Sequence, residues 1–215
     1  EKAEVTRQHF IANGYDDKAM EFIDCDLADL DSVSAALLQI RAVVKHRCID
    51  VLVENAAIWP SKFAQTKQQV EISFGTNVLG HFALRRGLLG SLLSDHARVI
   101  VLTGDIYVLA DGCTPNFRWR GARGAMQAYC RSKLGNFWIA RELQKRHSHL
   151  NVFIVHPGVA ATGLGGGYRG LGGRLKRRLL ISPQDAAQTA LLCATQNDLT
   201  HGSYYHNVHG EAELN

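Results

Sequence analysis

The chain has 215 residues, of which 46% are hydrophobic and 20% are charged, as in an ordinary soluble globular protein. This length suffices to bury a sizeable core within one domain. The formal net charge of +4 is small and diffuse, so it argues against a nucleic-acid-binding protein. We find no apolar run of the ~18 residues that suggest a membrane span, and no signal-peptide pattern.

Cysteine usage indicates the redox compartment. The five cysteines are an odd number, are scattered and include no Cys-x-x-Cys pair, which favours reduced thiols inside the cell. Glu1 stands within a helical pattern, so we expect more chain upstream. We therefore expect an intracellular protein, either cytoplasmic or held on an intracellular membrane by that upstream segment.

Short apolar runs alternate with helical patterns along the chain, which predicts repeated β-α units around a parallel sheet. The expected strands are residues 21–25, 50–54, 98–103, 151–156 and 203–206. The expected helices are residues 30–45, 70–93, 127–146 and 183–194. No linker or repeat interrupts this order, so a single domain over residues 1–215 is predicted.

A glycine-rich and then basic stretch, at about residues 163–181, predicts a variable substrate lid. Gly165, Gly167 and Gly170 satisfy the G-x-G-x-x-G dinucleotide pattern. That pattern normally follows the first strand of its domain, whereas here it follows a late one, so a flexible lid is the better interpretation. Basic residues alternating with leucines in this lid predict either a solvated face or contact with a membrane surface.

Tyr129 and Lys133 are spaced one helical turn apart, so their side chains share a helix face. An ammonium beside a phenol can bring the tyrosine pKa closer to neutrality and make it a general acid or base. The alternative is a packed tyrosine next to a lysine whose stem lies along the apolar surface.

Five short segments are similar to the short-chain dehydrogenase/reductase family and follow one another in the family's order. They are Asp24-Cys25-Asp26-Leu27, Glu54-Asn55-Ala56-Ala57, Asn77-Val78-Leu79-Gly80-His81-Phe82, Tyr129 with Lys133, and His156-Pro157-Gly158-Val159 with Thr162. The runs NVLGHF and AYCRSKLGNFWIARELQKR resemble the retinol-dehydrogenase-like branch closely. The resemblance implies a doubly wound α/β domain of the Rossmann type.

The resemblance also implies roles for individual residues. Tyr129 would exchange a proton with the substrate oxygen, Lys133 would hold the nicotinamide ribose, and Asn77 would order a water in the proton relay. The implied cofactor-binding residues are Asp26, Leu27, Asn55, Ala56, Ala57, Tyr129, Lys133, Pro157, Gly158, Val159 and Thr162. Taken without the resemblance, Asn77 is a polar residue near a helix start and Asp26 a turn residue.

Two departures from the family pattern stand out. The first β-α-β unit, with its glycine-rich phosphate loop, has no counterpart, so we expect an N-terminal truncation and a central gap in the sheet between residues 21–25 and 50–54. Gly104 occupies the position of the family's catalytic serine. Thr103 could replace that serine only if the strand register shifts, because neighbouring side chains on a strand point to opposite faces.

The sequence thus predicts an NAD(P)-dependent oxidoreductase that interconverts an alcohol and a carbonyl of a small lipophilic compound, such as a retinoid or steroid. The resemblance favours NADP slightly over NAD and leaves a homodimer open. The alternative is a catalytically impaired relative that acts as a binding or scaffold protein. No metal site is expected, because the spacing of His201, His206, His209 and Glu211 matches no zinc signature.

Overall fold

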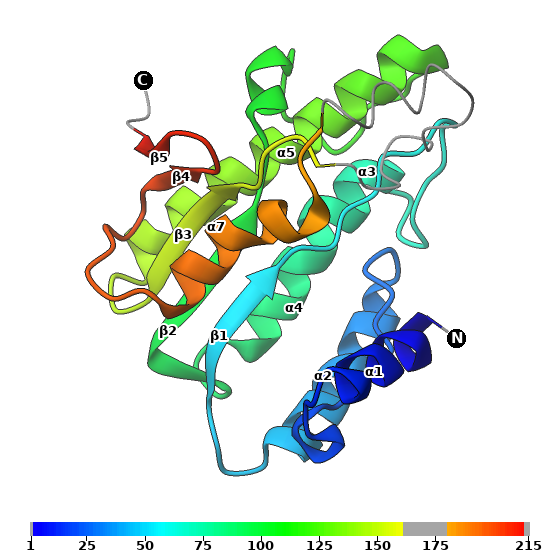
Figure 1. Cartoon of the computed structure of the whole chain (residues 1–215). Coiled ribbons are helices and arrows are strands. Elements are labelled where there is room, and N and C mark those ends of the chain that lie inside the picture. Colours follow the sequence, from blue (N-terminus) through cyan, green and yellow to red (C-terminus); the bar gives the residue numbers. More distant parts are fainter. Residues whose placement is uncertain (1, 161–179, 213–215) are drawn as a thin grey trace.

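Five strands form one continuous sheet in the order β1-β2-β3-β4-β5 (Figure 1). In this computed structural model residues 2–160 and 180–212 are described. The strands are β1 (Ile49–Glu54), β2 (Leu93–Leu102), β3 (Asn151–His156), β4 (Tyr204–His206) and β5 (Gly210–Ala212). The first four are mutually parallel, and β5 pairs with β4 in the antiparallel sense. The predicted α/β fold with a mainly parallel sheet is therefore confirmed.

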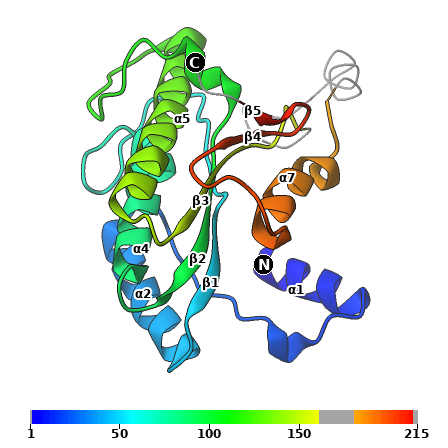
Figure 2. The ribbon, with the colours of Figure 1, turned by 90° about the vertical axis from the view of Figure 1, so that its left-hand side faces the viewer.

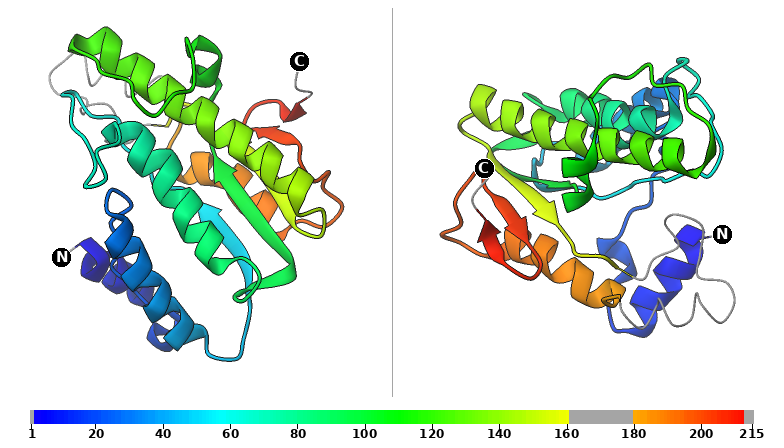
Figure 3. Two further views of the ribbon diagram at one scale, coloured as in Figure 1. Left: turned by 180° about the vertical axis from the view of Figure 1, so that it is seen from behind. Right: turned by 90° about the horizontal axis from the view of Figure 1, so that it is seen from above.

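Helices cover both faces of this sheet. They are α1 (Lys2–Ala12), α2 (Leu30–Val44), α3 (Ile72–Phe74), α4 (His81–Leu88), α5 (Gly121–Arg146) and α7 (Pro183–Thr195). Two 3-10 turns, η1 (Asp17–Ala19) and η3 (Asp105–Leu109), and a π-helix, η2 (Gly75–Gly80), complete the described elements. Figure 2 shows α5 and α4 on one face and α7 on the other, and Figure 3 shows α2, α4 and α5 side by side.

The core follows from the apolar runs of the central strands. Val99, Ile100 and Val101 of β2 are almost fully buried, as are the apolar residues of β3. Alternate residues of each strand pack toward α5 and toward α7, giving one apolar cluster on each face. Strands buried on both faces are expected to be apolar throughout, which is why the two runs identified these strands correctly.

The predicted strand at residues 21–25 is wrong, because this segment forms no strand and is mostly exposed. A strand persists only with a hydrogen-bonded neighbour, and no described strand lies next to this segment. The expected central gap is also absent, since the described sheet is continuous and begins at β1. Val51 and Val53 of that edge strand are 38% and 45% exposed.

The other predicted elements are present, but two of them begin earlier than expected: β2 begins at Leu93 instead of residue 98, and α5 begins at Gly121 instead of residue 127. The helix expected at residues 70–93 is divided into α3, η2 and α4 and ends at Leu88, after which β2 begins. The helix expected at residues 183–194 starts as predicted, because Ser182 Oγ accepts a hydrogen bond from the Asp185 N–H and Pro183 occupies the first turn. Strand β5 was not anticipated.

Candidate active site

Tyr129 and Lys133 lie on the face of α5 that packs against the sheet, and both are buried. The Lys133 Nζ atom lies 5.5 Å from the centre of the Tyr129 ring. Nζ also donates a 3.1 Å hydrogen bond to the carbonyl of Leu102, the last residue of β2. This bond fixes the ammonium at the carboxyl end of the sheet, where ligands of open α/β sheets bind.

Burial is the main cause of the pKa shifts of Tyr129 and Lys133. It lowers the pKa of Lys133 to about 8 and raises the pKa of Tyr129 to about 12. Both shifts favour the neutral form of the group, as desolvation does. The expected lowering of the tyrosine pKa by the ammonium is therefore not found in this structure.

Trp59 covers the Tyr129 ring, which the sequence interpretation missed. The two rings are parallel within 1°, with their centres 4.6 Å apart. Trp59 comes from the loop after β1, and its neighbour Ile58 is tied to Asn77 by two hydrogen bonds. No short-range pattern marks this contact, because it joins two segments 70 positions apart in the sequence.

Asn77 lies within η2, the π-helical segment, and is fully buried. Its Oδ1 accepts from the Ile58 N–H at 2.8 Å, and its Nδ2 donates to the Ile58 carbonyl at 3.0 Å and to Ser132 Oγ at 2.9 Å. One amide thus joins the loop after β1, the π-helix and α5. Such π-helical turns occur frequently at functional sites.

Gly104 follows β2 at the position where the resemblance places a serine. Its backbone is extended, with φ 177° and ψ 146°, which any residue can adopt. Thr103 cannot take over, because its Oγ1 donates to the Lys133 carbonyl at 2.8 Å. The β2–β3 pairing is regular through Leu102 and Val155, so the register shift that Thr103 would need is absent.

Glu54, the last residue of β1, forms a buried ion pair with Arg85 of α4. Glu54 and Arg85 are 4% and 2% exposed, and Arg85 Nη1 lies 2.5 Å from each carboxylate oxygen. Asn55 and Ala56 are exposed, Ala57 is half-buried, and the Ala56 carbonyl accepts a hydrogen bond from His81. Sequence reasoning missed Arg85, although a buried acid at position 54 requires a partner.

The turn at Asp26 and Leu27 lies against the start of α4. Asp26 is exposed and its Oδ1 accepts from the Ala28 N–H at 2.9 Å, as in an Asx-turn. Leu27 is buried, and a Cβ added to Gly80 would lie 2.3 Å from its carbonyl oxygen. Glycine at position 80 thus permits the close approach that places this turn.

The Pro157-Gly158-Val159 segment leaves the end of β3. Gly158 has φ +83°, a left-handed backbone conformation that favours glycine. Val159 is 66% exposed, and its carbonyl accepts from the Ile181 N–H. Thr162 and almost all of the expected lid, with its glycines and basic residues, lie outside the described residues.

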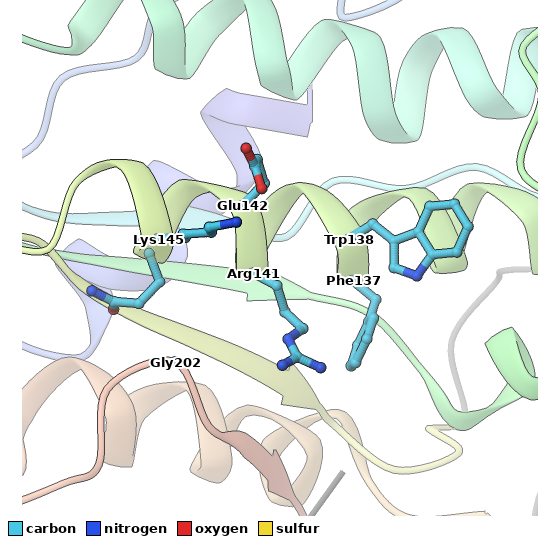
Figure 4. A pocket seen from close by; sticks show the side chains of 7 residues that line it. Phe137, Trp138, Arg141, Glu142, Lys145 and Gly202 are labelled. Carbon is cyan, nitrogen blue, oxygen red and sulfur yellow. The ribbon is translucent and has the colours of Figure 1, made fainter. Parts of the chain in front are cut away.

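A separate open depression of about 720 Å³ lies beyond Lys133, toward the C-terminal end of α5 (Figure 4). It is lined by Phe137, Trp138, Arg141, Glu142, Gln144, Lys145 and Gly202. None of the sequence-predicted site residues lines it. Within the described ranges, no helix is long and apolar enough to cross a membrane.

Comparisons with known proteins agree with these observations. The family model described as short chain dehydrogenase matches residues 1–170. Retinol dehydrogenase 14 of Homo sapiens is 34% identical over 145 residues, which cover 66% of this chain and 43% of that protein. Retinol dehydrogenase 13 of Mus musculus is 33% identical over 202 residues, which cover 87% of this chain and 60% of that protein.

Solved structures share the fold. An uncharacterised protein from Mycobacterium Paratuberculosis has a TM-score of 0.61 at 30% identity, covering 85% of this chain and 60% of that chain. The NADPH-bound carbonyl reductase from chicken fatty liver has a TM-score of 0.62 at 14% identity, covering 89% of this chain and 76% of that chain. The chain thus spans about half the length of the curated relatives named above.

Proposed function

We propose that this chain, which belongs to the short chain dehydrogenase family, interconverts an alcohol and a carbonyl with a nicotinamide cofactor. The observation that supports this most is the convergence of Tyr129, Lys133 and Asn77. Lys133 lies beside the Tyr129 ring, and Asn77 is bonded through Ser132 to the same helix. A positioned phenol next to a buried amine, at the carboxyl ends of parallel strands, suits proton transfer to a substrate oxygen.

Tyr129 donates its phenolic proton to the carbonyl oxygen in reduction and recovers it in alcohol oxidation. Its pKa of about 12 keeps the phenol protonated at neutral pH, which is the form that reduction requires. Lys133 has a pKa near 8 and is mainly charged at neutral pH, so it favours the phenolate as that forms. Trp59 keeps water from one face of the phenol.

The residues present fit the nicotinamide and ribose half of a dinucleotide. An ammonium carries three N–H donors, and the described residues engage one of those of Lys133, through Leu102. Exposed Asn55, Ala56 and Val159 offer backbone groups at the same edge of the sheet. When bound, a nicotinamide supplies or accepts the hydride. NADP is favoured over NAD by the NADPH-bound and NADP-bound enzymes among the fold neighbours.

A lipophilic substrate of the retinoid or steroid kind is proposed from the retinol dehydrogenases among the relatives. The aromatic wall made by Trp59 over Tyr129 is suited to an apolar compound. All five cysteines are free, which supports a reducing intracellular compartment. We also propose that the protein is cytoplasmic or attached to an intracellular membrane, and that it forms a homodimer.

The test is reduction of retinaldehyde by the native full-length protein with NADPH. Tyr129→Phe should lower kcat about 10²–10⁴-fold, the usual contribution of a positioned acid or base, and leave cofactor binding unchanged. Tyr15→Phe is the matched control, since Tyr15 is 62% exposed on the N-terminal segment. Equal turnover of the Tyr129→Phe and Tyr15→Phe variants would refute the proposal, and a wild-type protein that binds NADPH without turnover would favour the scaffold alternative.

A further inference from the structure

Asp105, His156 and His206 meet at the carboxyl ends of β2, β3 and β4, beside Gly104. Asp105 opens η3, and the two histidines end β3 and β4. The Asp105 Oδ2 atom lies 3.0 Å from His206 Nε2 and 3.7 Å from His156 Nε2. Parallel pairing of β3 with β4 sets the two histidines directly opposite each other. The sequence interpretation found no zinc signature at His206 and assigned no catalytic role to Asp105, His156 or His206.

The hydrogen bonds define the protonation of Asp105 and His206. The Val208 N–H donates to His206 Nδ1 at 2.9 Å, so Nδ1 holds a lone pair and Nε2 carries the proton. Nε2–H then donates to Asp105 Oδ2, and the Tyr204 hydroxyl donates to Asp105 Oδ1. Although the three ligand atoms lie within 4.8 Å of one another, a metal would need a lone pair on His206 Nε2. This arrangement is therefore a proton network rather than a metal site.

His156 has a buried ring nitrogen, Nδ1, that lacks a hydrogen-bond partner among the described residues. Its Nε2 lies 3.7 Å from the Asp105 carboxylate, beyond hydrogen-bond range, and we assign the ring proton to this nitrogen because it faces the negative charge, which leaves Nδ1 with a lone pair. Nδ1 has no hydrogen-bond partner among the described residues, and the residue is 8% exposed. A buried polar atom left unpaired costs ~1–3 kcal/mol, so it calls for an explanation. A Cβ built on Gly104 would lie 3.5 Å from this nitrogen.

Resting on the function proposed above, we propose that His156, backed by Asp105, contacts the substrate oxygen in place of the serine hydroxyl that the chain lacks at position 104. The unpaired Nδ1 lies 3.5 Å from the position that a Cβ on residue 104 would occupy, on the side where the missing side chain would be. In its protonated form the imidazole donates Nδ1–H to the carbonyl oxygen while negative charge builds on that oxygen. No covalent bond to His156 forms or breaks, and Tyr129 remains the proton donor.

The proposal implies a pH dependence, because only the imidazolium can donate from Nδ1. The charged or titratable groups that face His156 are Asp105, His206 and Lys133. Burial lowers the pKa of His156, Asp105 opposes that shift, and His206 and Lys133 add to it. The donor form thus accumulates as the pH falls below the ordinary value of about 6.5. Carbonyl reduction should therefore accelerate toward acid pH.

Nitrogen-15 NMR of the histidine rings of this chain tests the resting state. We expect His156 at neutral pH to be the tautomer protonated at Nε2, with Nδ1 bare, and to titrate below the ordinary histidine value of about 6.5. Asp105→Asn should move that titration to still lower pH, because the stabilising carboxylate is lost. A proton on Nδ1 at neutral pH, or binding of Zn²⁺ through His156 and His206, would overturn the proposal.

Kinetics of the native full-length protein with retinaldehyde and NADPH test the role itself, between about pH 5 and 8. His156→Asn should abolish the rise toward acid pH and lower kcat there by about 10²-fold, within the range for loss of one oxyanion donor. Adding Gly104→Ser to His156→Asn should restore about 10-fold with no pH dependence, since a hydroxyl donates at any of these pH values. His149→Asn, at an exposed site, should match the wild type.

The outcomes separate this inference from the function on which it rests. If Tyr129→Phe abolishes turnover but His156→Asn keeps the wild-type pH profile, the inference is wrong and the proposed function stands. If the wild type binds NADPH and turns over no carbonyl probe, both are wrong. Loss of activity in His156→Asn that Gly104→Ser cannot restore would show a structural role for the histidine and would also overturn the inference.

Discussion

Removing one member of the buried Glu54–Arg85 pair should be among the most destabilising single changes in this chain. Their side chains are each 3% exposed, and the guanidinium Nη1 is 2.5 Å from the carboxylate. Arg85→Met leaves a buried carboxylate without its counter-ion, which costs ~3–5 kcal/mol. Domains of this kind are stable by only ~5–15 kcal/mol, so the variant should be close to unfolding under mild conditions.

The double variant separates the cost of an unpaired charge from the value of the pair. Replacing both Glu54 and Arg85 with methionine removes both charges and fills a similar volume, which is often neutral or stabilising. We therefore expect the double variant to be more stable than either single variant. The control is Glu142→Ala at the exposed Glu142–Arg146 pair, with side chains 49% and 72% exposed, which should change stability little because solvent screens the pair.

Equilibrium unfolding in urea at neutral pH measures these differences. Additive costs in the double variant would refute the reasoning, because they would mean that the two charges do not depend on each other. A cost below ~1 kcal/mol for Arg85→Met would refute it as well, since that value belongs to exposed pairs.

Three further predictions use the same structure. Burial lowers the pKa of Lys133 to about 8, so between pH 8 and the ordinary lysine value of 10.5 the unfolded chain binds a proton that the folded chain lacks. The stability of the wild type relative to Lys133→Met should therefore rise with pH through that window, while the raised pKa values of Tyr129 and Cys193 act in the opposite sense in both proteins. A difference between the two proteins in urea unfolding that does not change with pH would contradict this prediction. Trp59→Ala should let water reach the Tyr129 phenol and so move its pKa from about 12 toward 10, as measured by ultraviolet titration. An unchanged pKa would show that Trp59 does not shield the phenol from water. Gly80→Ala should lower the free energy of unfolding by ~1–3 kcal/mol, because its Cβ would overlap a backbone carbonyl. Gly104→Ala should lower it much less, because its Cβ would make only a 3.5 Å contact and its backbone is extended. Equal losses in thermal unfolding would contradict the packing argument.

Local sequence patterns correctly predicted those strands whose continuous apolar residues indicate burial. The apolar run at residues 151–156 is β3 because a strand buried on both faces must be apolar throughout. The segment at residues 21–25 has a similar local pattern but forms no strand, since the decisive factor is a neighbouring strand and not its own composition. Strand β5 is three residues long and carries too little pattern to detect.

In the candidate site, too, the sequence predicts some contacts and leaves others undetected. Tyr129 and Lys133 could be paired from sequence because helical periodicity fixes neighbours four residues apart. Trp59 over Tyr129, Arg85 on Glu54, and His206 on Asp105 join segments far apart in the chain. Such contacts depend on the fold as a whole, so only the structure reveals them.

Deuterium transfer is the measurement that tests the central claim most directly. The native full-length protein would be incubated with retinaldehyde and NADPH carrying deuterium at the transferable position of its nicotinamide ring, and the alcohol examined by mass spectrometry. We predict one deuterium on the carbinol carbon with the wild type and with Tyr15→Phe, and labelled alcohol formed about 10²–10⁴-fold more slowly with Tyr129→Phe. Unlabelled alcohol from the wild type, or labelled alcohol at the wild-type rate from Tyr129→Phe, would contradict the proposed function.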